Sequence, residues 1–280
     1  MDGSFKHLVP LLLFTTLIII AAGMVLAVGD IHLLLYPWEH TSSFLTISLV
    51  LIIVASLTSL LHLGRKERAH RAFIGLANSW LSREAVFAGL TGLFTAVSLG
   101  LALIGSAGFG FVVLLSAASL ASIILTVSIG MLYNLPVQLS WNGTENSLAP
   151  LISSFLLCSY VFVFWAQGLS FSIAFFVIWI LDVFLFLLRA STFIRLGKNE
   201  HVLLFPSLRP YVFSGLAARF ILSVGLMLLI VLDEHALPLY FICATVLLDR
   251  FCLYAGTAQL SPKAEIASIK DQRMKAASEL

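Results

Sequence analysis

The stretch FGFVVLLSAASLASIILTVSIGMLY at residues 109–133 decides the class of fold. It contains no charged side chain, and an α-helix needs about 20 mainly apolar residues to cross a hydrocarbon core of about 30 Å. The apolar run is continuous rather than alternating, and a backbone inside lipid must satisfy its own hydrogen bonds. The stretch is therefore predicted to be a transmembrane helix and not a strand of a barrel.

Seven further runs of this kind lie along the chain. Of its 280 residues, 60% are hydrophobic and 11% are charged, whereas soluble domains carry about 25% charged residues. The sequence thus predicts an all-α integral membrane protein, a bundle of eight transmembrane helices in one domain over 1–262, followed by a polar tail over 263–280. The expected spans are 8–28, 43–63, 84–104, 109–133, 148–167, 170–189, 211–232 and 237–258.

The positive charges are distributed unevenly between the two ends of this bundle. Eight crossings bring both termini and the loops after spans two, four and six to one side, which we call face A; the opposite side is face B. Fourteen of the 16 Lys and Arg residues, Arg189 among them, fall on face A or its margin. Face A and both termini are therefore predicted to be cytoplasmic, with acidic loops facing outward at Asp30, Glu39, Asp233 and Glu234. A net charge of +2 gives no indication of a nucleic-acid partner.

Ionisable side chains inside the spans are expected to face a partner or a cavity, because they are costly in lipid. Arg219 and Arg250 lie about 12 Å from face A at 1.5 Å per residue, and Asp182 is expected at a similar depth. The structural explanation is that Arg219 and Arg250 either extend to the membrane interface or pair with Asp182 and Asp249. Polar groups gathered in one leaflet favour a site served from face A over an ion channel or a transporter.

Further polar residues lie at span ends on face A. His62 closes the second span and can cap helix carbonyls, while Glu84 opens the third and can serve its N-terminal dipole with Ser82 as the cap. Tyr133 and Asn134 end the fourth span, where Tyr133 is expected as an interfacial aromatic.

Bound cofactors are not expected in this chain. A haem held by two histidines needs two of them inside spans, but of seven histidines only His62 lies within one. No span contains a lysine for a Schiff base, and the three cysteines form no CxxC pair. The sequence therefore predicts no haem, no iron-sulfur cluster and no metal here.

Five short motifs carry a resemblance to a known family. Segment 61–89 reads LHLGRKERAHRAFIGLANSWLSREAVFAG, with Leu-His-Leu-Gly, Arg-Ala-Phe and Ser-Arg-Glu in order. Tyr133-Asn134 follows span four, and Arg250 precedes Tyr254-Ala255-Gly256 in span eight. This pattern resembles the DmsC family, the membrane-anchor subunits of anaerobic dimethyl sulfoxide reductase. Arg83 departs from it, because the family tends to have Asn there.

The resemblance implies a role in the inner membrane of a bacterium, in anaerobic respiration. It implies that menaquinol is oxidised as a substrate, and that the partners are a four-cluster iron-sulfur subunit and a molybdopterin catalytic subunit. His62 corresponds to the family's quinol-site histidine, and Glu84 to its acidic residue at the start of span three; both are expected to act in catalysis. The expected quinol-binding residues are His62, Arg71, Glu84, Asn134, Arg250 and Tyr254.

The chemistry of these residue types suits that role. Quinol oxidation releases two protons as well as two electrons, so it needs a base near neutral pH, and histidine has an unperturbed pKa of about 6.5. The electrons must leave for the iron-sulfur partner, which is expected to rest on loop 64–82. Two alternatives stay open at this point: a secondary transporter, and a purely structural anchor without a quinol site.

Overall fold

The computed structural model describes residues 3–34, 40–62, 75–106, 108–134, 141, 143–165, 172–197, 202–204, 209–231, 237–256 and 258–260. Within these residues, eight helices are long and apolar enough to cross a membrane. They are α1 (Gly3–Leu34), α2 (Thr41–His62), α3 (Trp80–Leu103), α4 (Phe109–Leu132), α5 (Thr144–Trp165), α6 (Ser172–Gly197), α7 (Arg209–Val231) and α8 (Leu237–Ala255). The predicted all-α bundle of eight membrane-spanning helices is confirmed.

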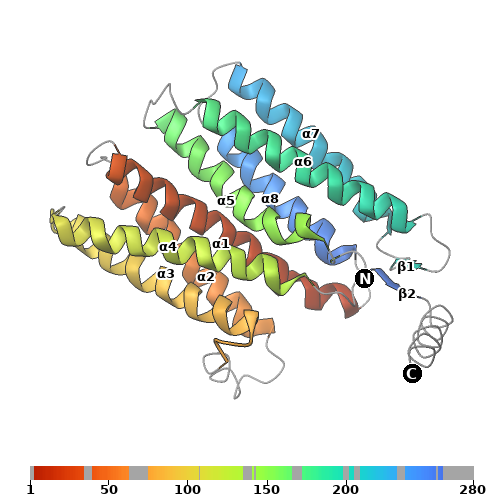
Figure 1. Ribbon diagram of the computed structural model, residues 1–280, viewed down its shortest axis with the longest axis horizontal. Helices are drawn as coiled ribbons and strands as arrows, with labels where there is room; N and C mark the ends of the chain where they lie inside the picture. Colours follow the sequence, from red (N-terminus) through yellow and green to blue (C-terminus); the bar gives the residue numbers. More distant parts are fainter. Residues whose placement is uncertain are drawn as a thin grey trace, which may run out of the picture.

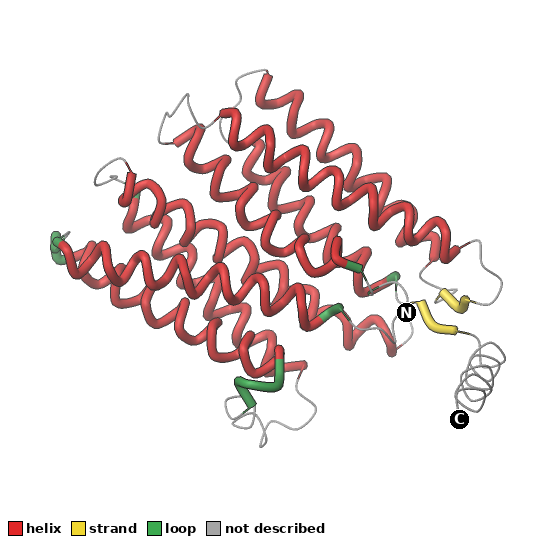
Figure 2. Tube along the Cα trace, viewed as in Figure 1, coloured by secondary structure: helices red, strands yellow, loops and turns green. Residues whose placement is uncertain are grey.

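Successive helices run in opposite directions through the bundle (Figures 1 and 2). Face A therefore collects the starts of α1, α3, α5 and α7 and the ends of α2, α4, α6 and α8. Face B collects the other eight helix ends. The sequence-predicted site residues that the structure describes lie at these face A ends: Glu84 near the start of α3, Asn134 after the end of α4, and Arg250 and Tyr254 toward the end of α8.

Helix α1 lies at the centre of this arrangement. It runs between α2–α4 on one side and α5–α8 on the other, and it packs against α2, α4, α5 and α8 (Figure 1). Small residues permit this close packing: a Cβ atom on Gly23 would lie 2.8 Å from the Ser154 carbonyl oxygen on α5, and one on Gly29 would lie 2.1 Å from Ser119 Oγ on α4. The core of the molecule follows α1, where Ile18, Ala21 and Val25 have no exposed surface.

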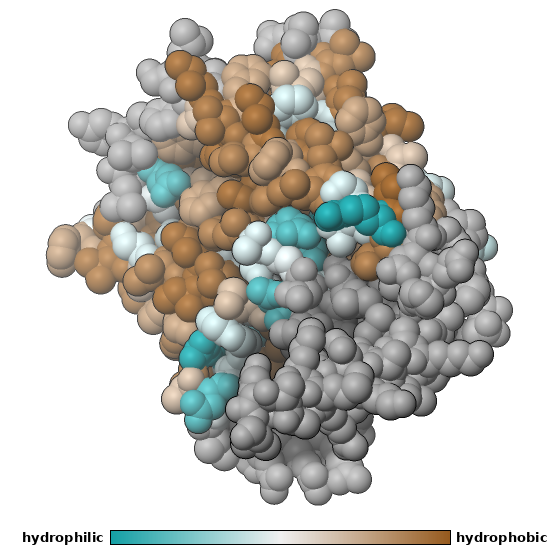
Figure 3. Space-filling view, turned by 45° about the vertical axis from the view of Figure 1, so that its right-hand side comes forward, coloured by the Kyte–Doolittle hydropathy of each residue, from teal (hydrophilic) through white to brown (hydrophobic). Residues whose placement is uncertain are grey.

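The surface that the structure describes is largely apolar (Figure 3). Phe109 is 86% exposed, Ile104 76% and Ile221 68%, and many other large apolar side chains point outward. Contiguous apolar surface of this extent requires a lipid environment. The protein is therefore a multi-pass membrane protein.

Some boundaries differ from the predicted ones because the helices continue past the apolar runs. α6 ends at Gly197 and not at 189, so Arg189 lies inside a helix and Asp182 lies near its middle, deeper than expected. α1 continues to Leu34, so Asp30 lies in a helix and not in a loop.

Two short strands were not expected: β1 (Val202–Leu204) pairs antiparallel with β2 (Ala258–Leu260). The tail 263–280 lies outside the described residues.

Candidate functional site

Glu84 is the buried carboxylate of the candidate site. α3 begins at Trp80, and the Ser82 N–H donates to Ser79 Oγ at 3.3 Å, so Ser79 caps the helix and the expected cap, Ser82, was wrong. Glu84 consequently sits a full turn inside α3, where it is 4% exposed. Its Oε2 atom has no hydrogen-bond partner among the described residues. A capping role does not explain a carboxylate in this position.

Three aromatic rings meet at face A. Tyr133 follows the last residue of α4, Trp141 lies before α5, and Tyr254 is in the last turn of α8. The ring centroids of Tyr133 and Tyr254 are 5.2 Å apart, those of Tyr133 and Trp141 5.5 Å, and those of Trp141 and Tyr254 6.3 Å, all in edge-to-face geometry. Trp141 Nε1 donates to the Leu253 carbonyl oxygen at 2.9 Å, which fixes the indole against α8.

The Tyr254 phenol belongs to a hydrogen-bonded chain. Its hydroxyl donates to Thr15 Oγ1 at 3.1 Å, and Thr15 donates to the Leu11 carbonyl oxygen at 3.0 Å. Burial, together with the neighbouring Tyr254, raises the pKa of Tyr133 well above its usual value. Tyr133 thus stays a neutral hydrogen-bond donor throughout the physiological pH range.

Arg250 brings a positive charge to the same place. Its side chain is 1% exposed, and Nη2 donates to Asp249 Oδ2 at 2.8 Å. Within the described part of the chain, its Nε and Nη1 atoms have no hydrogen-bond partner. Both the Arg250 guanidinium and the Glu84 carboxylate interact electrostatically with Tyr133. One acid, one arginine and two phenols from α3, α4 and α8 therefore converge at face A.

Asp249 links this cluster to a second arginine. Its Oδ1 atom accepts from Arg189 Nη1 at 2.5 Å, and Arg189 Nη2 also donates to the Glu145 carbonyl oxygen at 3.3 Å. The predicted pairing of Arg250 with Asp249 is confirmed. The contribution of Arg189 was missed because it was assigned to the margin of face A. Arg189 lies seven residues after Asp182, two turns further along the same face of α6, and this spacing could have predicted that it also faces the interior of the bundle.

Arg219 forms a separate buried pair. It donates to Asp182 and to Ser223 Oγ, and its guanidinium carbon lies 5.3 Å from the centre of the Phe186 ring. Ser153 Oγ also donates to Asp182, at 3.5 Å. The predicted pairing of Arg219 with Asp182 is confirmed, and these contacts give Arg219 a structural role in joining α5, α6 and α7.

The remaining predicted site residues are only partly described. His62 is the last residue of α2, but its side chain lies outside the described part, as does all of Arg71. Asn134 directly follows Tyr133, is half-buried, and donates its backbone N–H to the Met131 carbonyl oxygen at 3.2 Å. The structure thus brings together Glu84, Arg250 and Tyr254. It adds Tyr133, Trp141 and Thr15, which sequence reasoning did not include in the site.

Arg83 has a structural explanation. Its Nε and Nη2 atoms donate to the carbonyl oxygens of Leu76 and Ala77 at 2.9 and 2.7 Å. The guanidinium carbon lies 4.1 Å from the centre of the Trp80 ring. Arg83 therefore holds the turn that leads into α3 and so helps to set the position at which Glu84 enters the bundle.

The arrangement supports proton transfer and hydrogen bonding. A buried carboxylate accepts or releases a proton, neutral phenols donate and accept hydrogen bonds, and a guanidinium stabilises a negatively charged oxygen. Among the described residues, no group of three or more His, Cys, Asp or Glu side chains could hold a metal ion.

Comparisons with known proteins leave the family assignment open. No protein-family model matches the chain, and no curated protein matches it.

Proposed function

We propose that this protein is a membrane anchor that binds and oxidises menaquinol at face A and passes the electrons to an iron-sulfur subunit. The observation that carries the proposal is Glu84. Its carboxylate is almost fully buried, has an oxygen without a partner among the described residues, and interacts electrostatically with the Tyr133 phenol, as the Arg250 guanidinium also does. Burying an ionisable side chain inside a membrane protein costs free energy, so such a residue is by default a candidate for a functional site.

The side chains suit the two halves of a quinol ring. A quinol gives up a proton from each hydroxyl as its electrons leave, and Glu84 is a base within the bundle that can take one of them. Arg250 has two nitrogen atoms free among the described residues, and these can donate to the second ring oxygen. Tyr133, Tyr254 and Trp141 offer the apolar faces and edges against which an aromatic ring packs.

The remaining parts of the proposal rest on the sequence motifs. His62, at the end of α2, is assigned as the second proton acceptor, and Arg71 and Asn134 as further quinol contacts. The electrons pass to a four-cluster iron-sulfur subunit docked on face A, and from it to a molybdopterin-dependent reductase of the dimethyl sulfoxide reductase type. The complex would lie in the inner membrane with both termini of this chain in the cytoplasm.

Glu84→Gln tests the proposal directly, because it removes the charge and keeps the shape. The complex is purified gently, and its reduction by menaquinol is compared with its reduction by an artificial donor that bypasses the anchor. We expect quinol-dependent activity to fall by about 100-fold, the loss typical of a missing general base, with the artificial donor unaffected. Glu145→Gln, a half-buried carboxylate on the first turn of α5, is the matched control. Wild-type quinol turnover in Glu84→Gln would exclude the proposed role.

A secondary transporter is the second candidate. The pair of Arg219 with Asp182 lies deep in the bundle, and Asp30 lies toward face B, so polar groups are not confined to face A. Such groups are what an alternating-access pathway would use. Co-purification with molybdenum or tungsten and iron favours the anchor, whereas solute uptake by the chain alone in vesicles favours the transporter. If the chain were a structural anchor without a quinol site, His62→Ala would leave both the assembly of the complex and its quinol-dependent activity unchanged.

A further inference from the structure

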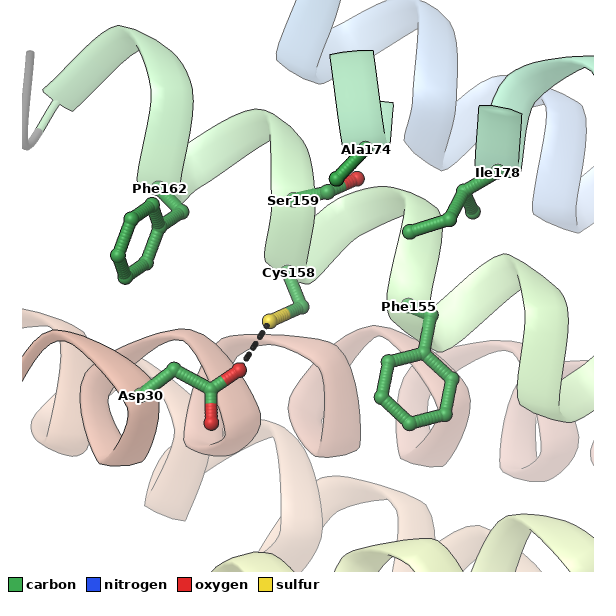
Figure 4. A pocket seen from close by; sticks show the side chains of 7 residues that line it. All are labelled: Asp30, Phe155, Cys158, Ser159, Phe162, Ala174 and Ile178. Atoms are coloured by element: carbon green, nitrogen blue, oxygen red, sulfur yellow. Dashed lines mark hydrogen bonds between the residues drawn. The ribbon is translucent and has the colours of Figure 1, made fainter. Parts of the chain in front are cut away.

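A pocket lies toward face B, far from the candidate site. It lies between the end of α1, the second half of α5 and the first turns of α6, and its volume is about 130 Å³. A single buried water needs a cavity of only about 10–15 Å³, so the pocket has room for a small organic group. Its lining residues are Asp30, Phe155, Cys158, Ser159, Phe162, Ala174 and Ile178 (Figure 4).

Asp30 is the charged group of this pocket. Its side chain points from α1 toward α5, where Cys158 Sγ donates to Asp30 Oδ2 at 3.3 Å (Figure 4). A thiol is a weak donor and carries no compensating charge. Among the described residues, no Lys, Arg or His forms an ion pair with Asp30. This differs from Asp182 and Asp249, each of which is paired with arginine.

The walls of the pocket are apolar and partly aromatic. Phe155 and Phe162 lie on either side of Cys158 along α5, and Ala174 and Ile178 close the pocket from α6 (Figure 4). A carboxylate in an apolar setting is stabilised by a cation, and aromatic rings attract cations that carry alkyl groups. We propose that this pocket binds an alkylammonium group, with Asp30 as its counter-ion and Phe155 and Phe162 as its aromatic walls.

Other ligand classes fit the pocket less well. Asp30 and Cys158 are residue types that can bind metals, but structural zinc takes four ligands. Among the described residues, no group of three or more such side chains could hold a metal ion. An anion would be repelled by Asp30. A neutral apolar molecule would leave the carboxylate without a counter-charge.

The alkylammonium group could come from two sources. Asp30 lies one residue inside the end of the first span, Val9–Ile31, so the pocket is close to the level of the lipid headgroups. One source is the headgroup of phosphatidylethanolamine, and the other is a free amine from the solution on face B. Both present a positively charged ammonium group to Asp30, and the experiment below separates them.

The first measurement is binding to the purified full-length chain in detergent. The probes are choline and 3,3-dimethylbutan-1-ol, which has the same shape without the charge, and the readout is isothermal titration. We expect choline to bind at least about tenfold more tightly, which corresponds to about 1.4 kcal/mol. Asp30→Asn should abolish this difference, and Phe155→Leu should weaken choline binding without affecting the fold. Glu145→Gln, on the same helix at face A, should bind choline as the wild type does.

The second measurement is native mass spectrometry with added phosphatidylethanolamine or phosphatidylglycerol. Preferential retention of phosphatidylethanolamine by the wild type but not by Asp30→Asn identifies the lipid headgroup as the occupant. Choline binding without any lipid preference identifies a free amine. Equal affinity for choline and its neutral analogue, unchanged choline affinity in Asp30→Asn, or no binding of either class would overturn the proposal. None of these results depends on the quinol site, because Asp30 lies at the opposite end of α1.

Discussion

Asp249 is the residue whose loss should destabilise the bundle most clearly. Both of its oxygens are used, Oδ1 by Arg189 at 2.5 Å and Oδ2 by Arg250 at 2.8 Å, and all three side chains are at most 4% exposed. The triad carries two positive charges and one negative charge. Asp249→Asn keeps the shape, removes the negative charge, and leaves two buried guanidinium groups without compensation.

The size of the effect follows from this charge count. Removing one partner of a buried ion pair costs about 3–5 kcal/mol, because the remaining charge stays buried. Asp249→Asn affects two arginines at once, so we expect a loss of about 5 kcal/mol in the free energy of unfolding. Asp182→Asn affects only Arg219, which keeps its hydrogen bond to Ser223, so it should cost about 3 kcal/mol.

Unfolding in mixed detergent micelles, followed by tryptophan fluorescence, measures these differences. The double variant Asp249→Asn with Arg189→Met returns the triad to a single excess positive charge. It should therefore be more stable than Asp249→Asn alone, even though it has lost one more native side chain. The reasoning is refuted if Asp249→Asn unfolds like the wild type, or if removing Arg189 as well lowers the stability further.

Three further predictions concern packing and the candidate site. Gly130→Ala should lower the free energy of unfolding by about 3 kcal/mol, because the new Cβ would lie 1.9 Å from the Ser147 carbonyl oxygen. Gly100→Ala, whose Cβ would have no atom within 4 Å, should raise that free energy by about 0.5–1 kcal/mol. Equal melting temperatures of the two variants would contradict this. Arg83→Asn should cost about 1 kcal/mol, measured by the same unfolding assay, because two hydrogen bonds to backbone carbonyls are lost. Tyr133→Phe should slow menaquinol oxidation by the same factor at pH 6 and pH 8, because burial keeps the pKa of this phenol well above its usual value; a factor that changes with pH would show that the phenol titrates.

The eight helices could be predicted from the sequence because the bilayer imposes one simple requirement on each span. A run such as 109–133 is long enough and has no charge, so hydropathy alone identifies it. The pairing of Arg219 with Asp182 could also be predicted, since a charge buried in lipid requires an opposite charge. The helix ends were less accurate at α1 and α6, because both helices continue beyond the apolar run that predicts them.

The candidate site was only partly predictable. Glu84, Arg250 and Tyr254 were identified by their residue types and motifs, but Trp141 lies between helices in a segment with no periodic pattern. Its place beside Tyr254 depends on how α4, α5 and α8 pack, and this is a tertiary property that no local pattern encodes. The role of Arg189 was hidden for a related reason: its partner Asp249 lies 60 residues away.

Arg250 shows how one side chain can serve both structure and function. Arg219 and Arg189 use both terminal nitrogens, Arg219 toward Asp182 and Ser223 and Arg189 toward Asp249 and the Glu145 carbonyl oxygen, and each leaves only Nε without a partner among the described residues. These two arginines therefore stabilise the second half of the bundle. Arg250 gives one nitrogen to Asp249 and, among the described residues, has two without a partner, and its charge interacts with Tyr133. Arg250→Lys should therefore keep the pair with Asp249 and the fold but weaken quinol binding, because an ammonium group cannot contact the carboxylate and a ring oxygen in the same planar geometry. A variant with wild-type quinol affinity would make Arg250 structural only.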